Sequence, residues 1–82
     1  MSPKEKETLT LLARGYPSVE IADCLGVTPN YIYSLIRLLK ARFGTRTNAG
    51  IVSHAIAEGI ITADGTFTEE EAQILEPAAH RR

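Results

Sequence analysis

Apolar residues recur at intervals of three and four along about the first sixty residues, which is the period of an amphipathic α-helix. The pattern predicts four helices, each followed by a glycine that can adopt a left-handed conformation and end it. The expected helices cover residues 3–14, 19–25, 29–43 and 48–58, and the glycines are Gly15, Gly26, Gly44 and Gly59. The fold class that follows is all-α, a small helical bundle.

Short polar residues and prolines at the start of each apolar segment support these boundaries. Pro3 and Pro29 each stand at an expected first helical position, and Glu5 completes a capping box in the first helix. The expected N-caps are Ser2, Ser18, Thr28 and either Thr47 or Asn48.

The pattern changes after residue 61. Residues 62–67 contain an Asp-Gly pair between β-tolerant residues, which favours a small hairpin or an irregular turn. The run Thr-Glu-Glu-Glu at residues 68–71 is typical of another capping box, and it predicts a short acidic helix that ends near Pro77. We therefore divide the chain into a helical domain, residues 1–61, and an acidic C-terminal extension, residues 62–82.

Composition excludes several classes of protein. The 82 residues suffice for one compact domain, with 44% hydrophobic and 23% charged residues. No apolar run approaches the ~20 residues of a membrane span and there is no secretory leader, so we expect a cytoplasmic location. The single cysteine, Cys24, excludes an internal disulfide, and we expect it to be buried on the second helix. The sequence contains no nucleophile motif, phosphate-binding glycine loop or metal-ligand cluster. We therefore expect neither enzymatic activity nor a bound cofactor or metal.

The charges are distributed unevenly, although the net charge is only −1. Residues 28–46 carry four basic side chains and no acid, whereas residues 58–76 carry six acids and no base. The basic residues are Arg37, Lys40, Arg42 and Arg46. Because a phosphate backbone responds to the local field rather than to the total charge, the basic stretch is compatible with nucleic-acid binding.

The second and third predicted helices have the spacing of a helix-turn-helix. Ala22 is small where the two helices should cross, and Gly26 lies where a positive φ angle would turn the chain sharply. Apolar contacts that would fix the angle between the helices come from Ile21, Leu25, Val27 and Ile32. This arrangement lets the second of the two helices enter the ~12 Å major groove. The expected architecture is thus a four-helix helix-turn-helix bundle with a short extra C-terminal segment.

A projection of the third helix at 100° per residue separates two faces. Its core stripe is Ile32, Ile36, Leu39 and Phe43, and its outer face is Asn30, Tyr33, Ser34, Arg37, Lys40, Ala41 and Gly44. The outer face suits DNA, since arginine can bond guanine bidentately and asparagine can bond adenine in the same way. The alternative is an ordinary solvated helix face. Beside the stripe lies an apolar flank, Tyr31, Leu35 and Leu38, which either packs within the monomer or binds a partner.

Three segments carry a resemblance to a known family. The segments "SPKEKETLTLLARGYPSVEIADCLGVT", "LLKARFGT" and "AGIVSHAIAEGII" resemble the opening helices, the end of the recognition helix and the final helix of the LuxR-type (GerE-type) DNA-binding domain. The resemblance runs without a gap over residues 2–61. It implies the helix-turn-helix fold and binding to double-stranded DNA.

The chain also departs from that family. Where the family commonly has Thr-Val-Lys-x-His at the start of the recognition helix, residues 31–35 are Tyr-Ile-Tyr-Ser-Leu, so a lysine and a histidine are missing. By position, the resemblance implies that Tyr33, Ser34 and Arg37 contact bases. It implies in the same way that Thr28, Lys40 and Arg46 contact phosphates. Fewer cations imply a shallower salt dependence.

The resemblance further implies a homodimer through the fourth helix, with Ile51, His54, Ala55 and Glu58 as interface candidates. We expect His54 at an interface or surface rather than on a metal, because no second ligand lies at a suitable spacing. LuxR-type regulators normally join this module to a receiver or ligand-binding domain, and this sequence has none. A methionine directly before the first cap favours a complete short gene product, the alternative being an excised domain.

Two functions are compatible with these observations. The first is a dimeric transcription regulator that recognises double-stranded DNA through its third helix. The second is a protein-interaction module that keeps the fold and uses its tyrosine- and leucine-rich surface to bind a protein partner such as a transcription component. The helix-turn-helix spacing and the family resemblance favour the first function, which we take as the main expectation, whereas the depleted recognition helix and the acidic extension favour the second as its alternative.

Overall fold

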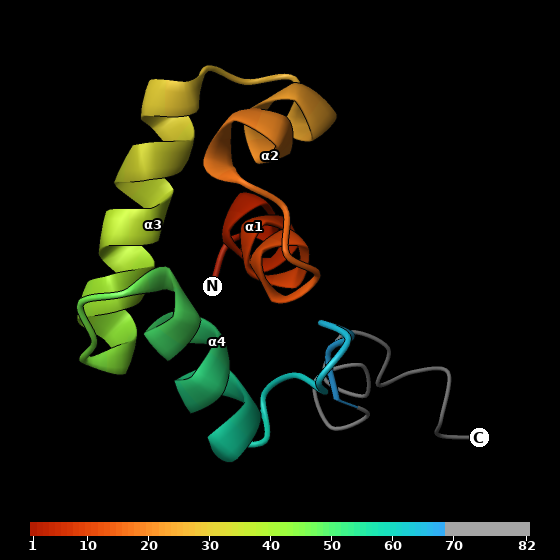
Figure 1. Ribbon diagram of the computed structural model, residues 1–82, viewed down its shortest axis with the longest axis vertical. Coiled ribbons are helices and arrows are strands. Elements are labelled where there is room, and N and C mark those ends of the chain that lie inside the picture. Colours follow the sequence, from red (N-terminus) through yellow and green to blue (C-terminus); the bar gives the residue numbers. More distant parts are fainter. Residues whose placement is uncertain (69–82) are drawn as a thin grey trace.

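The computed structural model describes residues 1–68, and these form four helices, α1 (Pro3–Ala13), α2 (Ser18–Leu25), α3 (Pro29–Phe43) and α4 (Asn48–Ala57). In Figure 1, α3 forms one side of the molecule, with α2 beside its first turns and α4 beside its last turns. Helix α1 is seen nearly end-on between α2 and α4. The expected all-α, four-helix architecture is confirmed. None of these four helices is both long enough and apolar enough to cross a membrane.

Three of the four expected N-caps are present. Ser2 forms the full capping box, since its Oγ accepts from the Glu5 amide at 3.2 Å and its own amide donates to Glu5 Oε1 at 2.7 Å. Thr28 and Thr47 cap α3 and α4 through their hydroxyl oxygens. The prediction for the second helix was wrong, because Pro17 occupies the cap position and Ser18 is the first residue of α2, without a side-chain cap hydrogen bond.

The core draws apolar side chains from all four helices. The predicted stripe of α3 is confirmed, with every member buried, and its neighbours in the core are Leu9, Ile21, Ala22, Ile51, Ala55 and Ile61. The apolar flank on α3 does not behave as one unit. Leu35 is buried at 6% exposure and belongs to the core, whereas Tyr31 and Leu38 remain 42% and 56% exposed.

Cys24 is exposed, so the prediction that it is buried was wrong. Ile21 and Ala22 fill the buried side of α2, and Cys24 lies two residues beyond Ala22. At 100° per residue, Cys24 lies about 110° around the helix from the midpoint of Ile21 and Ala22, so its side chain is on the flank of α2, outside the packed surface.

Residues 60–68 form a compact turn after α4. A single antiparallel bridge joins Ile61 to Phe67, and the amide of Thr68 donates to the carbonyl of Ile60 at 3.1 Å. The expected hairpin or irregular turn is therefore present, as a turn closed by one bridge pair. The acidic helix expected beyond Thr68 lies outside the described residues, and the domain boundary at Ile61 stays a prediction.

This turn is attached to α1. The Thr10 hydroxyl donates to the Gly65 carbonyl at 2.8 Å, and Arg14 Nε donates to the Asp64 carbonyl at 3.0 Å. Gly65 has a φ of +88°, and a Cβ atom at this position would lie 2.7 Å from the Thr10 carbonyl oxygen. A glycine is thus required for the turn to approach α1 so closely.

Candidate nucleic-acid interface

The connection between α2 and α3 fixes how α3 is presented. Gly26 ends α2 in the left-handed conformation, with φ 69° and ψ 35°. The next amide, that of Val27, donates back to the Ala22 carbonyl at 3.0 Å, and Thr28 then caps α3. Ala22 is 1% exposed. The chain therefore turns within residues 26–28, and the two helices form the corner that the sequence predicts.

The outer face of α3 is open to solvent along its length. Among the predicted DNA-contacting residues, Asn30, Tyr33, Ser34 and Arg37 are exposed, whereas Lys40 is half-buried at the edge of the face. Tyr33, Arg37 and Lys40 follow at intervals of four and three residues, so they share one side of the helix. Arg46 is exposed in the connection to α4, and the Thr28 hydroxyl accepts from the Tyr31 amide at 3.2 Å.

A polar cleft of about 350 Å³ lies against this face. It brings together the first residues of two helices, Ser18 of α2 and Asn48 of α4, with side chains from the middle of α3. The residues contributed by α3 are Tyr33, Ile36, Arg37 and Lys40. Helix N-termini present unpaired amides and a partial positive charge, so the cleft has the character of an anion site.

Ser18 and Asn48 were not predicted as members of this site. Ser18 was assigned only a capping role, and nothing in the linear spacing brings residues 18 and 48 together. The available signal was that both expected helix starts are polar and that the third helix between them is basic.

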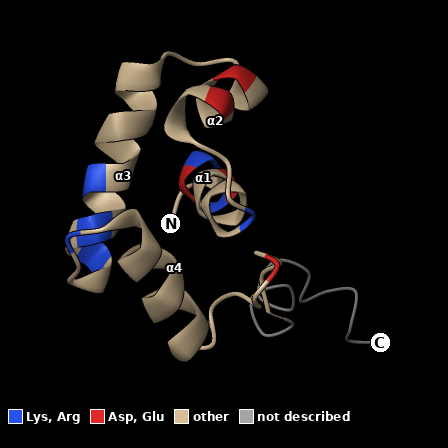
Figure 2. Ribbon diagram, viewed as in Figure 1, with Lys and Arg blue, Asp and Glu red and all other residues tan. Residues whose placement is uncertain are grey.

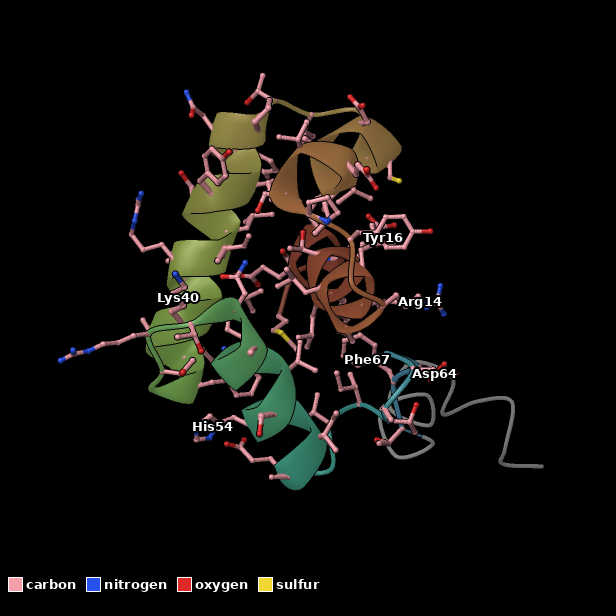
Figure 3. All side chains as sticks on the ribbon, in the orientation of Figure 1. Arg14, Tyr16, Lys40, His54, Asp64 and Phe67 are labelled. Atoms are coloured by element: carbon pink, nitrogen blue, oxygen red, sulfur yellow. The ribbon has the colours of Figure 1, made fainter. Side chains whose placement is uncertain are left out.

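The charged residues of α3 are all basic. Figure 2 shows that the basic positions of α3 lie in its middle and at its end, whereas the acidic positions of α2 lie away from it along the chain. Helix α3 contains no Asp or Glu, and Glu20 and Asp23 are both exposed on α2. Figure 3 places Lys40 and Arg14 on opposite sides of the molecule in this view, so Arg14 does not add to the basic face.

The structure corrects the list of dimer-interface candidates on α4. Ile51 and Ala55 are 0% exposed and belong to the core of the monomer, because their spacing of four residues places both on the packed side of the helix. They cannot contact a second copy while the core is intact. His54 and Glu58 are exposed, and Ile56, which was not predicted, is an apolar side chain on the outer side at 38% exposure.

A second hollow, of about 370 Å³, is mostly apolar. It lies between α1, Leu25 and Phe67, and Lys6 Nζ stands 5.5 Å from the centre of the Phe67 ring. Within residues 1–68, no three His, Cys, Asp or Glu side chains come close enough to hold a metal ion. Neither feature points to chemistry at the α3 face.

A comparison with known proteins gives one informative similarity. Over 65 residues the chain is 32% identical to the protein MctR of Rhizobium johnstonii. That protein is a transcriptional regulatory protein. The similar region covers 79% of this chain but 30% of MctR, so the chain spans less than a third of the length of that relative. No protein-family model and no solved structure matches the chain.

Proposed function

We propose that the protein binds double-stranded DNA in a sequence-specific manner as a transcription regulator, with α3 in the major groove. The observation that carries this proposal is the exposed, acid-free face of α3, which continues into the polar cleft between the starts of α2 and α4. A helix with its side chains is about 10–12 Å across and fits the ~12 Å groove. The similarity to MctR and the resemblance to LuxR-type domains support the same function.

The proposal divides the contacts by chemistry. Arg37 and Asn30 would bond base edges, since their side chains can pair bidentately with guanine and adenine, and Tyr33 with Ser34 would complete this contact. Lys40, at the edge of the cleft, would meet a phosphate together with the first-turn amides of α2, which have no side-chain cap. Further phosphate contacts are assigned to Thr28 and Arg46.

The remaining assignments follow from this function. The chain acts in the cytoplasm without a cofactor and without catalysis. It forms a homodimer through the outer side of α4, where His54, Glu58 and Ile56 are exposed. An isologous interface of this kind would present two copies of α3 to two half-sites.

A salt-dependent binding measurement tests the proposal. Arg37→Ala should weaken binding to a selected duplex by roughly 5- to 150-fold, the value of a bidentate base contact, and Lys40→Ala should lower the salt slope by about one. Arg14→Ala is the control for charge, because it removes the same charge on the side away from α3, and its Tm is measured alongside because it also loses the hydrogen bond to the Asp64 carbonyl. Fluorescence anisotropy over a range of salt concentrations measures both quantities. Equal affinities for Arg37→Ala and Arg14→Ala would remove α3 from the binding mechanism.

A second candidate function is binding to a protein partner. The specific observation that favours it is the exposure of Tyr31, Leu38 and Ile56, since large apolar side chains at a surface often mark contact sites. Capture of a defined transcription component by the purified protein, with no binding to any duplex in the same buffer, would establish this function instead.

A further inference from the structure

The exposed surface of α3 has two sides of different character. One side carries Asn30, Arg37 and Lys40, which are polar or charged. The other side carries Tyr31 and Leu38, seven residues apart and therefore nearly superimposed along the helix. The small, exposed side chains of Ser34 and Ala41 lie between the two sides. We call Tyr31, Leu38 and Ala41 the apolar edge.

The fold does not account for the apolar edge. The core side of α3 is already filled by its buried stripe and by Leu35. Leu38 is 56% exposed, more than any other large apolar side chain within residues 1–68, and Tyr31 is 42% exposed. Within residues 1–68 nothing covers these side chains, so they are available for a contact with a group outside this part of the chain.

The charges around the edge restrict what can cover it. Arg37 directly precedes Leu38, and Arg42 follows one turn later. At 100° per residue, the two arginines lie on opposite sides of Leu38. A ligand that covers Leu38 must then offer hydrogen-bond acceptors or negative charge to both arginines, with an apolar group between them. The major groove of DNA has this arrangement, with a guanine edge for Arg37, a backbone phosphate for Arg42 and thymine methyl groups beside the guanine.

We infer that the apolar edge contacts thymine methyl groups, so that thymines next to the base contacted by Arg37 determine part of the sequence preference. The inference rests on the proposed function, since it places the edge in the same groove as the polar side of α3. An acidic protein surface is less well matched, because the edge is continuous with the outward side chains of Arg37 and Asn30. Leu38 is thus assigned a role in specificity rather than in folding.

A double-mutant cycle between protein and DNA tests this inference. The probe is a duplex that the protein selects from a random pool, in one form with thymidine and in another with deoxyuridine, which lacks only the methyl group. The wild-type protein should bind the deoxyuridine duplex about fourfold more weakly for each methyl group that it covers. Leu38→Ala should bind both duplexes with nearly equal affinity. Tyr16→Ala, which shortens a side chain of 40% exposure on the side away from α3 in Figure 3, is the control and should keep the wild-type ratio.

Each outcome decides between the explanations. Equal wild-type affinity for the two duplexes would overturn the inference and leave the proposed function intact. A wild-type preference for thymidine that Leu38→Ala retains in full would also overturn it, because other residues would then sense the methyl groups. If the wild-type protein binds no duplex, the proposed function and the inference both fail, and a protein partner becomes the explanation of the edge. Thermal unfolding of Leu38→Ala checks that the exposed substitution leaves the fold unchanged.

Discussion

Replacement of Gly65 by alanine tests how tightly the C-terminal turn is joined to α1. The substitution lowers stability in two ways, through a strained backbone and through a steric clash. Gly65 has a φ of +88°, which an L-residue rarely adopts, and its added Cβ would lie 2.7 Å from the Thr10 carbonyl oxygen and 3.2 Å from the Ala13 Cβ. Gly26 provides the comparison, because it has a φ of +69° but no atom within 4 Å of the corresponding Cβ position.

The magnitudes differ accordingly. The left-handed backbone costs an L-residue roughly 1–2 kcal/mol, so Gly26→Ala should lower the free energy of unfolding by only this amount. Overpacking against a rigid neighbour costs roughly 1–3 kcal/mol more, so Gly65→Ala should lose about 2–5 kcal/mol. For a domain of this size each 1 kcal/mol lowers the Tm by about 4–8 °C. We therefore expect Gly65→Ala to melt at least about 4 °C below Gly26→Ala.

Thermal and urea unfolding of the two variants, followed by circular dichroism at the helical signal, measure this difference. The left-handed backbone contributes to both substitutions, so the difference in Tm reports the contacts of the added Cβ with Thr10 and Ala13. A Gly65→Ala variant that melts with or above Gly26→Ala would refute the reasoning, since the turn would then lie farther from α1 than the structure shows.

Three further predictions follow from local contacts. Thr47→Ala removes the hydroxyl that caps α4 and should cost about 1 kcal/mol in urea unfolding, whereas Ser18→Ala, which removes no cap bond, should cost little. Hydrogen bonding, first from the Thr62 hydroxyl, lowers the pKa of Asp64 to about 2. The resulting stability is present above the unfolded pKa and is lost as the pH falls through the folded pKa, so Asp64→Asn should reduce the fall in Tm between about pH 4 and pH 2; an unchanged fall would contradict this. Cys24 should react with a thiol reagent in the native protein, and protection until unfolding would show that it is buried after all.

The helix boundaries were predictable because their signals are local. A cap side chain reaches an amide only two or three residues ahead, so Ser2, Thr28 and Thr47 could be recognised from the sequence alone. Ser18 was the exception. A proline before it supplies the extended backbone that a cap needs, and Ser18 enters the helix instead.

Burial on the flanks of a helix was less predictable, because it depends on how wide a surface the neighbouring elements cover. Periodicity gave the centre of the α3 stripe correctly but could not separate Leu35, which the other helices cover, from Leu38, which they do not. The same limit applies to Ile51 and Ala55, whose placement at an interface came from a resemblance while packing places them in the core. Cys24 was predicted to be buried from its residue type alone, but its position on the flank of α2 leaves it exposed.

The candidate site also combines a feature that the sequence predicts with one that depends on packing. The outward face of α3 follows from a helical projection, and the structure leaves it open. The cleft does not follow, because Ser18 and Asn48 meet Arg37 and Lys40 only after three helices have packed. Contacts between residues so far apart in sequence carry no linear signal.

The length of α3 limits how much sequence information one copy can extract. Its 15 residues end at Gly44 in a left-handed conformation, so the helix is about 22 Å long at 1.5 Å per residue. This length spans about six base pairs at 3.4 Å each, and a given six-base-pair sequence occurs by chance roughly once in 4,000. If α3 is the recognition element, a bacterial-sized genome holds on the order of a thousand such sites. Selective control of one promoter then needs a second copy, or another protein, on the same stretch of DNA.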